Sequence, residues 1–103
     1  YLLHRGRGPV VRASWNGAVI AESSSTVRVE GNHYFPPESV DQTLLRGSER
    51  TSVCPWKGTA TYDDVVVDGK VNSAAAWTYL DPKEKAAHIR GHLAFWGGVE
   101  VSE

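Results

Sequence analysis

Three short turn signals divide this chain into strands and constrain its fold more than any other feature. Asn16-Gly17, Gly31-Asn32 and Asp68-Gly69 each lie between apolar segments in which apolar and polar residues tend to alternate. Such pairs supply the residues of positive φ that two-residue hairpin turns require, and the twist of those turns matches that of paired strands. The chain is therefore predicted to fold as successive antiparallel β-hairpins.

Two other segments differ from the alternating pattern. Residues 38–45 place Val40 and Leu44 four apart, which predicts a short helix or helical turn with both side chains on one face. Residues 46–50 are polar around Gly47 and are predicted to form a loop before the next strand begins at Thr51.

The strongest helical pattern begins at Asp81. This residue can act as an N-cap, Pro82 suits the first helical position, and Glu84 completes a capping box. Gly91 stands where a glycine in the left-handed conformation ends a helix. A helix of about nine residues is too short to be stable alone, so we expect Ile89 to anchor it to the core.

Strands dominate this pattern, and the helical segments are short. The order predicts a mainly β fold, an antiparallel β meander of hairpins with two short helices, rather than alternating β and α units. A chain of 103 residues has room for one hydrophobic core. We expect an N-terminal arm at residues 1–9 and a single domain at residues 10–103.

Charge and composition exclude several classes of protein. The net charge is −1, and a basic face suited to non-specific nucleic-acid binding is not expected; basic residues cluster only near the start, at His4, Arg5, Arg7 and Arg12. No apolar run approaches the ~20 residues that span a membrane. The single cysteine cannot form an internal disulfide, so we expect a cytoplasmic protein.

The segment from Thr51 to Tyr62 concentrates unusual side chains. Cys54 would act as a nucleophile if a nearby cation or histidine lowered its pKa. The alternative is a buried and inert thiol, which is common for free cysteine. Lys57, between Trp56 and Gly58, is either solvated or lines a pocket. Cys54 and Lys57 are the candidate catalytic residues.

Two familiar kinds of site do not fit the sequence. Lys57-Gly58 lacks the Gly-x-x-x-x-Gly-Lys-Ser/Thr pattern of a phosphate-binding loop. Structural zinc requires about four Cys or His ligands, often in Cys-x-x-Cys pairs, whereas this chain has one cysteine, and Gly91 is expected to separate His88 from His92. No metal site and no cofactor are predicted.

Aromatic side chains are more numerous than two hairpins need for a core. Trp77 and Tyr79 share one face of a predicted strand because side chains alternate. Aromatic residues with polar atoms line small-molecule pockets and protein interfaces alike. The candidate ligand-binding residues are Tyr34, Trp56, Lys57, Tyr62, Trp77, Tyr79 and His92.

Four motifs resemble a known family. They are His33-Tyr34-Phe35-Pro36, Cys54-Pro55-Trp56-Lys57-Gly58-x-Ala60-x-Tyr62, Ala75-Ala76-Trp77-x-Tyr79-x-Asp81-Pro82 and Ile89-x-Gly91-His92-x-Ala94-Phe95. In this order and spacing the chain resembles the domain of unknown function family 427, which some collections label nucleotidyltransferase-like. The chain has no Gly-Ser followed by paired metal-binding aspartates that would support that label.

The resemblance implies a β-tent-type fold, in which two antiparallel sheets are pinned at one edge around an aromatic-lined cleft. Relatives of this architecture include methionine sulfoxide reductase B and zinc-binding modules, but their Cys-x-x-Cys pairs are absent here. The family commonly carries Asn just before its Ala-Ala-Trp, where this chain has Ala74.

We therefore expect a domain that binds a small polar or aromatic molecule in a cleft lined by the Cys-Pro-Trp-Lys-Gly motif. The polar groups are expected from Cys54, Lys57 and Tyr62, and the opposite wall from Trp77, Tyr79 and His92. One alternative is a protein-interaction or homodimerisation module without catalysis. Another is a thiol- or lysine-dependent enzyme.

Overall fold

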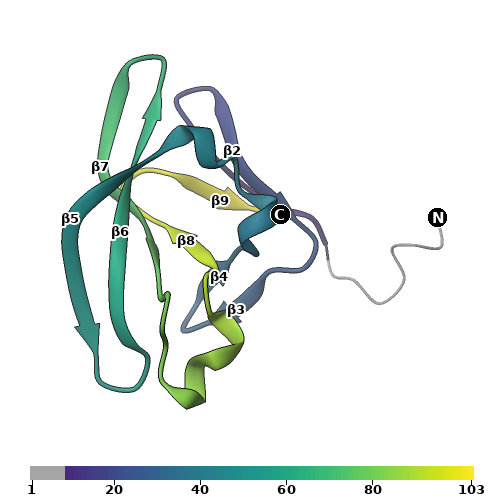
Figure 1. Ribbon diagram of the computed structural model, residues 1–103. Helices are drawn as coiled ribbons and strands as arrows, with labels where there is room; N and C mark the ends of the chain where they lie inside the picture. The colour runs from purple at the N-terminus through teal and green to yellow at the C-terminus, as the bar shows by residue number, and fades with distance from the viewer. Residues whose placement is uncertain (1–8) are drawn as a thin grey trace.

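The computed structural model describes residues 9–103 and has a mainly β fold, as predicted (Figure 1). The predicted arm, with its basic residues up to Arg7, lies outside the described residues except for Pro9. The strands are β1 (Val11–Trp15), β2 (Ala18–Ser23), β3 (Val27–Val29), β4 (Asn32–Tyr34), β5 (Leu45–Cys54), β6 (Gly58–Val67), β7 (Lys70–Thr78), β8 (Leu93–Phe95) and β9 (Glu100–Ser102). The 3-10 turns are η2 (Pro37–Ser39), η3 (Gln42–Leu44) and η4 (Glu84–Ile89).

Within the described residues, the strands form two larger antiparallel sheets and a two-stranded ribbon. One sheet has the order β2-β1-β9, and the other has the order β5-β6-β7-β8. The β3–β4 ribbon joins the edge of β8, where Phe35 and Leu93 exchange backbone hydrogen bonds of 2.7 and 2.9 Å. In Figure 1 the long strands β5, β6 and β7 form one side of the molecule, and η4 lies close to the turn between β5 and β6.

The predicted hairpins are confirmed, and one of them turns a residue earlier than expected. Asn16-Gly17 and Asp68-Gly69 have positive φ at both positions, as a type I′ turn requires. The remaining hairpin places positive φ at Glu30-Gly31 instead of Gly31-Asn32, because Asn32 is already paired as the first residue of β4.

Residues 46–50 do not form the predicted loop but belong to β5. A register shift between Gly47 and Thr51 absorbs them as a bulge against β6. Most of these side chains are exposed, so this part of the strand lacks the apolar alternation that identifies a strand in a sequence. The predicted helical segment at 38–45 is divided into η2 and η3 by Val40, which bridges to β2.

The helix predicted from Asp81 is the kinked 3-10 turn η4, which begins only at Glu84. The backbone N–H of Lys83 donates to the Lys57 carbonyl (2.9 Å), so a tertiary contact occupies the expected first turn. Ile89 is fully buried, as expected of the anchor, and Gly91 follows with a φ of +72°.

The buried side chains form two clusters. The first joins both larger sheets and includes Ile20, Phe35 and Val65. The second contains Tyr34, Ala60, Tyr79, Ala86, Ile89 and Ala94, and it packs η4 against β6, β7 and the β3–β4 ribbon. Among residues 9–103, no helix has the length and apolar character needed to cross a membrane.

Candidate functional site

A cavity of about 200 Å³ on one face of the four-stranded sheet is the best candidate site. It is lined by Lys57, Tyr62, Trp77, Tyr79 and Trp96, and we call it the aromatic cavity. Tyr62 of β6 lies directly opposite Trp77 of β7. Trp77 and Tyr79 are two residues apart and face the same way, as the alternation predicted.

The aromatic rings of this cavity contact one another. The ring centroids of Trp77 and Trp96 are 6.2 Å apart at an interplanar angle of 84°, which is an edge-to-face contact. Tyr62 lies 6.5 Å from Trp77 and 6.4 Å from Trp96. Its hydroxyl shares a 3.0 Å hydrogen bond with Ser52, so the phenol is fixed at both ends.

Both indole N–H groups of the cavity are also satisfied. Trp77 Nε1 donates to the hydroxyl of Tyr34 (3.2 Å), and Trp96 Nε1 donates to the carbonyl of Ala74 (2.7 Å). Because these hydrogen bonds fix the orientation of each ring, the cavity walls are organised before any ligand arrives.

Lys57 contributes a nearly buried ammonium to the lining of the cavity. Its side chain is 8% exposed, and Nζ donates to the carboxylate of Glu30. The same ammonium lies 5.2 Å from the Trp56 ring centroid and 5.7 Å from that of Tyr79. Burial is the largest single effect and lowers the pKa of Lys57. The hydrogen bond to Glu30 and the nearby Tyr34, Tyr79 and Cys54 together outweigh it, so the pKa is raised and Lys57 stays charged.

Glu30 reaches Lys57 from an unfavourable backbone position. It has a φ of +54° in the turn between β3 and β4, where Asn or Gly is the usual residue. Its carboxylate accepts from Lys57 and from Trp56 Nε1 (3.3 Å), and the hydrogen bond from Lys57, more than that from Trp56, lowers the pKa of Glu30. A strained position that carries a specific contact is typical of a functional site.

The Cys-Pro-Trp-Lys-Gly motif forms the turn that positions Lys57. Gly58 has a φ of +111°, which only glycine adopts without strain. Lys83, just before η4, holds this turn with its ammonium on the Pro55 carbonyl (2.6 Å) and its backbone N–H on the Lys57 carbonyl.

Arg50 adds a second cation beside the aromatic cavity. Its guanidinium lies 4.8 Å from the Tyr62 ring centroid and 5.1 Å from that of Trp96, so it stacks over both rings. Among residues 9–103 it is paired with no carboxylate. Glu30 neutralises the charge of Lys57, whereas the charge of Arg50 has no paired carboxylate among the described residues. The charged groups beside the cavity therefore leave it electropositive.

Four residues predicted for the site lie outside this cavity. Tyr34 is buried and its hydroxyl accepts from Trp77, whereas Trp56 is 37% exposed and its ring centroid lies 5.2 Å from the Lys57 ammonium. Cys54 is half-buried and packs against the second core cluster. His92 follows η4, where its Nδ1 hydrogen-bonds with the backbone carbonyl of Arg90 (3.1 Å).

Three residues at the cavity were not predicted as site residues: Trp96, which lines it, and Glu30 and Arg50, which contact its lining residues. Trp96 had a detectable signal, since it directly follows Phe95, the last residue of the fourth motif. Glu30 and Arg50 had no such signal in the sequence. Glu30 lies beside a predicted turn and Arg50 in a polar segment, and neither pattern indicates which distant residue the side chain will contact.

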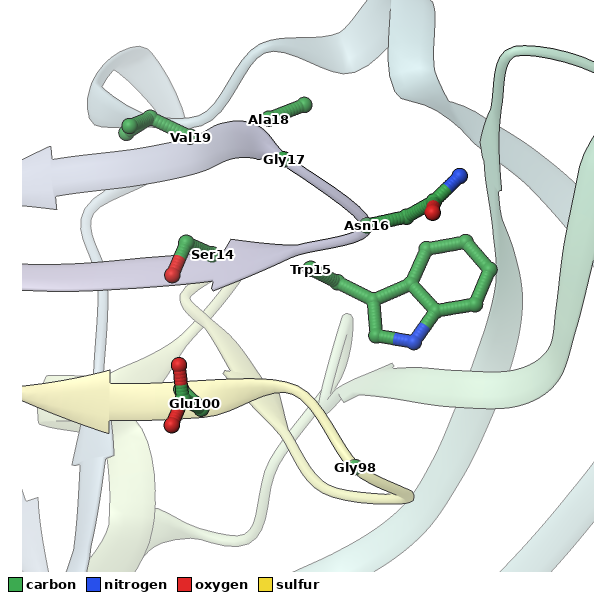
Figure 2. Close-up of a pocket in the computed structure, with 8 residues that line it drawn as sticks. All are labelled: Ser14, Trp15, Asn16, Gly17, Ala18, Val19, Gly98 and Glu100. Carbon is green, nitrogen blue, oxygen red and sulfur yellow. The ribbon is translucent and has the colours of Figure 1, made fainter.

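A larger hollow, of about 480 Å³, lies at the tip of the β1–β2 hairpin (Figure 2). It is lined by Ser14, Trp15, Asn16, Gly17, Ala18, Val19, Gly98 and Glu100. Most of this lining is turn backbone and small side chains, and none of its polar side chains is buried. The aromatic cavity is smaller, but it combines fixed rings with a buried charge and is therefore the better candidate.

No three His, Cys, Asp or Glu side chains in the described residues gather closely enough to hold a metal ion. In a comparison with protein families, a family model with the description "Domain of unknown function (DUF427)" matches residues 6–102, and its short label refers to a nucleotidyltransferase. This match confirms the resemblance found in the four motifs. No curated protein matches the chain.

Proposed function

We propose that this chain, which belongs to the DUF427 family, binds a small planar aromatic anion in the aromatic cavity. The observation that carries the proposal is the position of Lys57, a nearly buried ammonium in a cavity whose other lining residues are all aromatic. Glu30 offsets the cost of burying this charge, but an ammonium has three N–H donors, so Lys57 can also donate to an anionic ligand.

The size of the cavity favours a ligand with one ring system. A volume of about 200 Å³ admits a single ring with a short substituent. Trp77 and Trp96 meet nearly at right angles, so a ligand ring can stack on one indole and meet the edge of the other. Each such aromatic contact contributes about 0.5–1.5 kcal/mol beyond the area it buries.

The anionic group of the ligand has two cations available. The Lys57 ammonium has three donors, and Glu30, which is half-exposed, can share it with a second carboxylate. The Arg50 guanidinium presents a planar pair of donors that matches a carboxylate or phosphate. A neutral or cationic aromatic molecule lacks both interactions.

The geometry favours binding over covalent catalysis. A lysine nucleophile must lose its proton, but the Glu30 carboxylate raises the pKa of Lys57. The Cys54 thiol packs against the second core cluster and does not line the cavity.

Titration with benzoate tests the proposal directly. We expect benzoate to shift the indole N–H NMR signals of Trp77 and Trp96. Cyclohexanecarboxylate, which lacks the ring, and benzylammonium, which has the opposite charge, should bind at least several-fold more weakly. Equal effects of all three compounds, or no shift with benzoate, would contradict the proposal.

A pair of lysine variants identifies the charge responsible. Lys57→Met should weaken benzoate binding about tenfold, which corresponds to one lost charge-assisted hydrogen bond. Lys70→Met is the matched control, because Lys70 is exposed at the β6–β7 turn. Its benzoate affinity should equal that of the unmodified chain.

A second candidate function is self-association through the exposed indoles. Trp96 is 45% exposed and Trp56 is 37% exposed, and large exposed aromatic residues are typical of interfaces. Sedimentation equilibrium should then show a dimer whose population falls in Trp96→Ala. A monomer at all concentrations would rule out this candidate and leave the aromatic cavity proposal unaffected.

A further inference from the structure

The opposite face of the β6–β7 strand pair carries a second cavity, of about 370 Å³. Thr61 and Asp63 flank Tyr62 along β6 and therefore point away from the aromatic cavity. Thr78, which lies directly across from Thr61, alternates in the same way with Trp77. The lining residues are Pro37, Gln42, Thr61, Asp63, Thr78, Leu80, Gly91 and Leu93, and we call this space the polar cavity.

Two polar side chains of this cavity have no partner within residues 9–103. Thr78 is 6% exposed, and its hydroxyl is the one fully buried side-chain polar atom there without a hydrogen bond. The carboxylate of Asp63 is half-buried and takes part in no hydrogen bond or ion pair of the described residues. Buried polar groups are nearly always paired, so the unpaired hydroxyl of Thr78, in the same cavity as the unpaired carboxylate of Asp63, favours a ligand that can donate to both.

The charges around the polar cavity favour a cation. Burial raises the pKa of Asp63, and the neighbouring carboxylate of Asp64 raises it further, so a bound cation would relieve both effects. The nearby basic side chains are already engaged, since Arg46 pairs with Asp64 and Arg90 with Asp81. None of the residues that line the cavity is basic.

We propose that the polar cavity binds a small organic cation, a primary ammonium on a short alkyl chain, through Asp63 and the hydroxyls of Thr61 and Thr78. An ammonium donates three hydrogen bonds, which matches one carboxylate and two hydroxyl acceptors. The alkyl chain would cover Leu80, which is 63% exposed, and pack against Leu93.

Other ligand classes fit this cavity less well. A calcium or magnesium ion requires more oxygen ligands of fixed geometry than one carboxylate and two hydroxyls provide. An anion would be repelled by Asp63. A neutral polyol could satisfy Thr78 but would leave the carboxylate without a counter-charge.

Three probes of the same length separate these possibilities on the unmodified chain. In NMR titrations at constant ionic strength, n-butylammonium should shift the amide signals of Asp63 and Thr78. It should bind about tenfold more tightly than 1-butanol, and butyrate should not bind there. Equal binding of butylammonium and 1-butanol, or the absence of shifts at these residues, would overturn the proposal.

Matched variants then test the residues. Asp63→Asn should weaken butylammonium binding about tenfold. Asp68→Asn is the matched control, because it makes the same charge change at the β6–β7 turn. Asp68 has a positive φ, which Asn tolerates. Thr78→Val should weaken binding several-fold without lowering the unfolding midpoint. Asp63→Asn with unchanged affinity would also refute the proposal. These amide signals differ from the indole signals of the aromatic cavity, so either proposal can fail alone.

Discussion

The two faces of the β6–β7 strand pair differ in how far their polar groups are satisfied. On the aromatic face, Tyr62, Trp77 and Trp96 each have a hydrogen-bond partner for their polar atom. On the polar face, Asp63 and Thr78 have none among residues 9–103. One strand pair thus supports one face whose polar atoms are paired and another face on which Asp63 and Thr78 are unpaired among the described residues.

This difference follows from the alternation of side chains along a strand. Tyr62 and Asp63 are adjacent in the chain but belong to different cavities. A substitution can therefore act on one cavity and leave the other intact. Substitutions on the aromatic face should therefore lower the free energy of unfolding of the chain. Removing an unpaired polar group from the polar face should raise it.

The largest effect is expected for Trp77→Ala. This change removes the contacts of the indole with Tyr34, Tyr62 and Trp96 and leaves the Tyr34 hydroxyl without its donor. We expect a loss of about 3–5 kcal/mol in the free energy of unfolding, measured with urea. Trp56→Ala should lower the free energy of unfolding far less, because Trp56 is 37% exposed. Equal losses for the two variants would contradict the conclusion that the rings of the aromatic face are fixed by their contacts.

Glu30→Gln should have the next largest effect, with a characteristic dependence on pH. The pKa of Glu30 is lowered by Lys57, so its contribution to stability is present above its ordinary pKa of 4.5 and is lost as the pH falls through the lowered value. The pKa of Lys57 is raised, so its contribution is present below its ordinary value of 10.5 and is lost as the pH rises through the raised value.

The stability difference between the unmodified chain and Glu30→Gln should therefore be greatest between these two limits and vanish at both extremes. Urea unfolding at a series of pH values measures it. Glu49→Gln, an exposed control on β5, should show no such profile. A difference that does not change with pH would show that the carboxylate of Glu30 acts without its charge.

Much of this arrangement could be predicted from the sequence because it depends on local rules. The turn pairs gave the hairpins, and alternation placed Trp77 with Tyr79 on one face. The pairing of Glu30 with Lys57 could not be predicted, since the two residues are 27 apart and meet only when the β3–β4 ribbon joins β8. The polar cavity depends in the same way on the register that sets Thr61 opposite Thr78.

The wrong predictions have physical causes of the same kind. Arg50 was assigned to a loop, because a bulged strand with exposed side chains has no apolar alternation. The helix expected at Asp81 begins three residues later, because the backbone N–H of Lys83 is held by the β5–β6 turn. Tertiary contacts of this kind override capping signals.

On the polar face, Thr78→Val should stabilise the chain by about 1 kcal/mol. The substitution keeps the shape of the side chain and removes a buried hydroxyl that has no partner. Urea unfolding checks this value. Thr61→Val is the control on the neighbouring strand, and its effect should be smaller because Thr61 is only half-buried. A loss of stability in Thr78→Val would mean that the hydroxyl is already satisfied.

The smallest effect is expected at Ala74, in the middle of β7. Ala74 has a φ of +53°, and its backbone is held on both sides: its N–H donates to Asp64 (2.8 Å), and its carbonyl accepts from Trp96. A left-handed alanine is strained, whereas glycine is not, so Ala74→Gly should stabilise the chain by about 0.5 kcal/mol.

Ala75→Gly, one residue further in the buried strand, should instead destabilise the chain, since it removes a methyl group from the core and gains nothing in backbone conformation. Thermal unfolding of the two variants measures the contrast, and a destabilising Ala74→Gly would show that packing of the Ala74 methyl group outweighs the strain of its left-handed backbone.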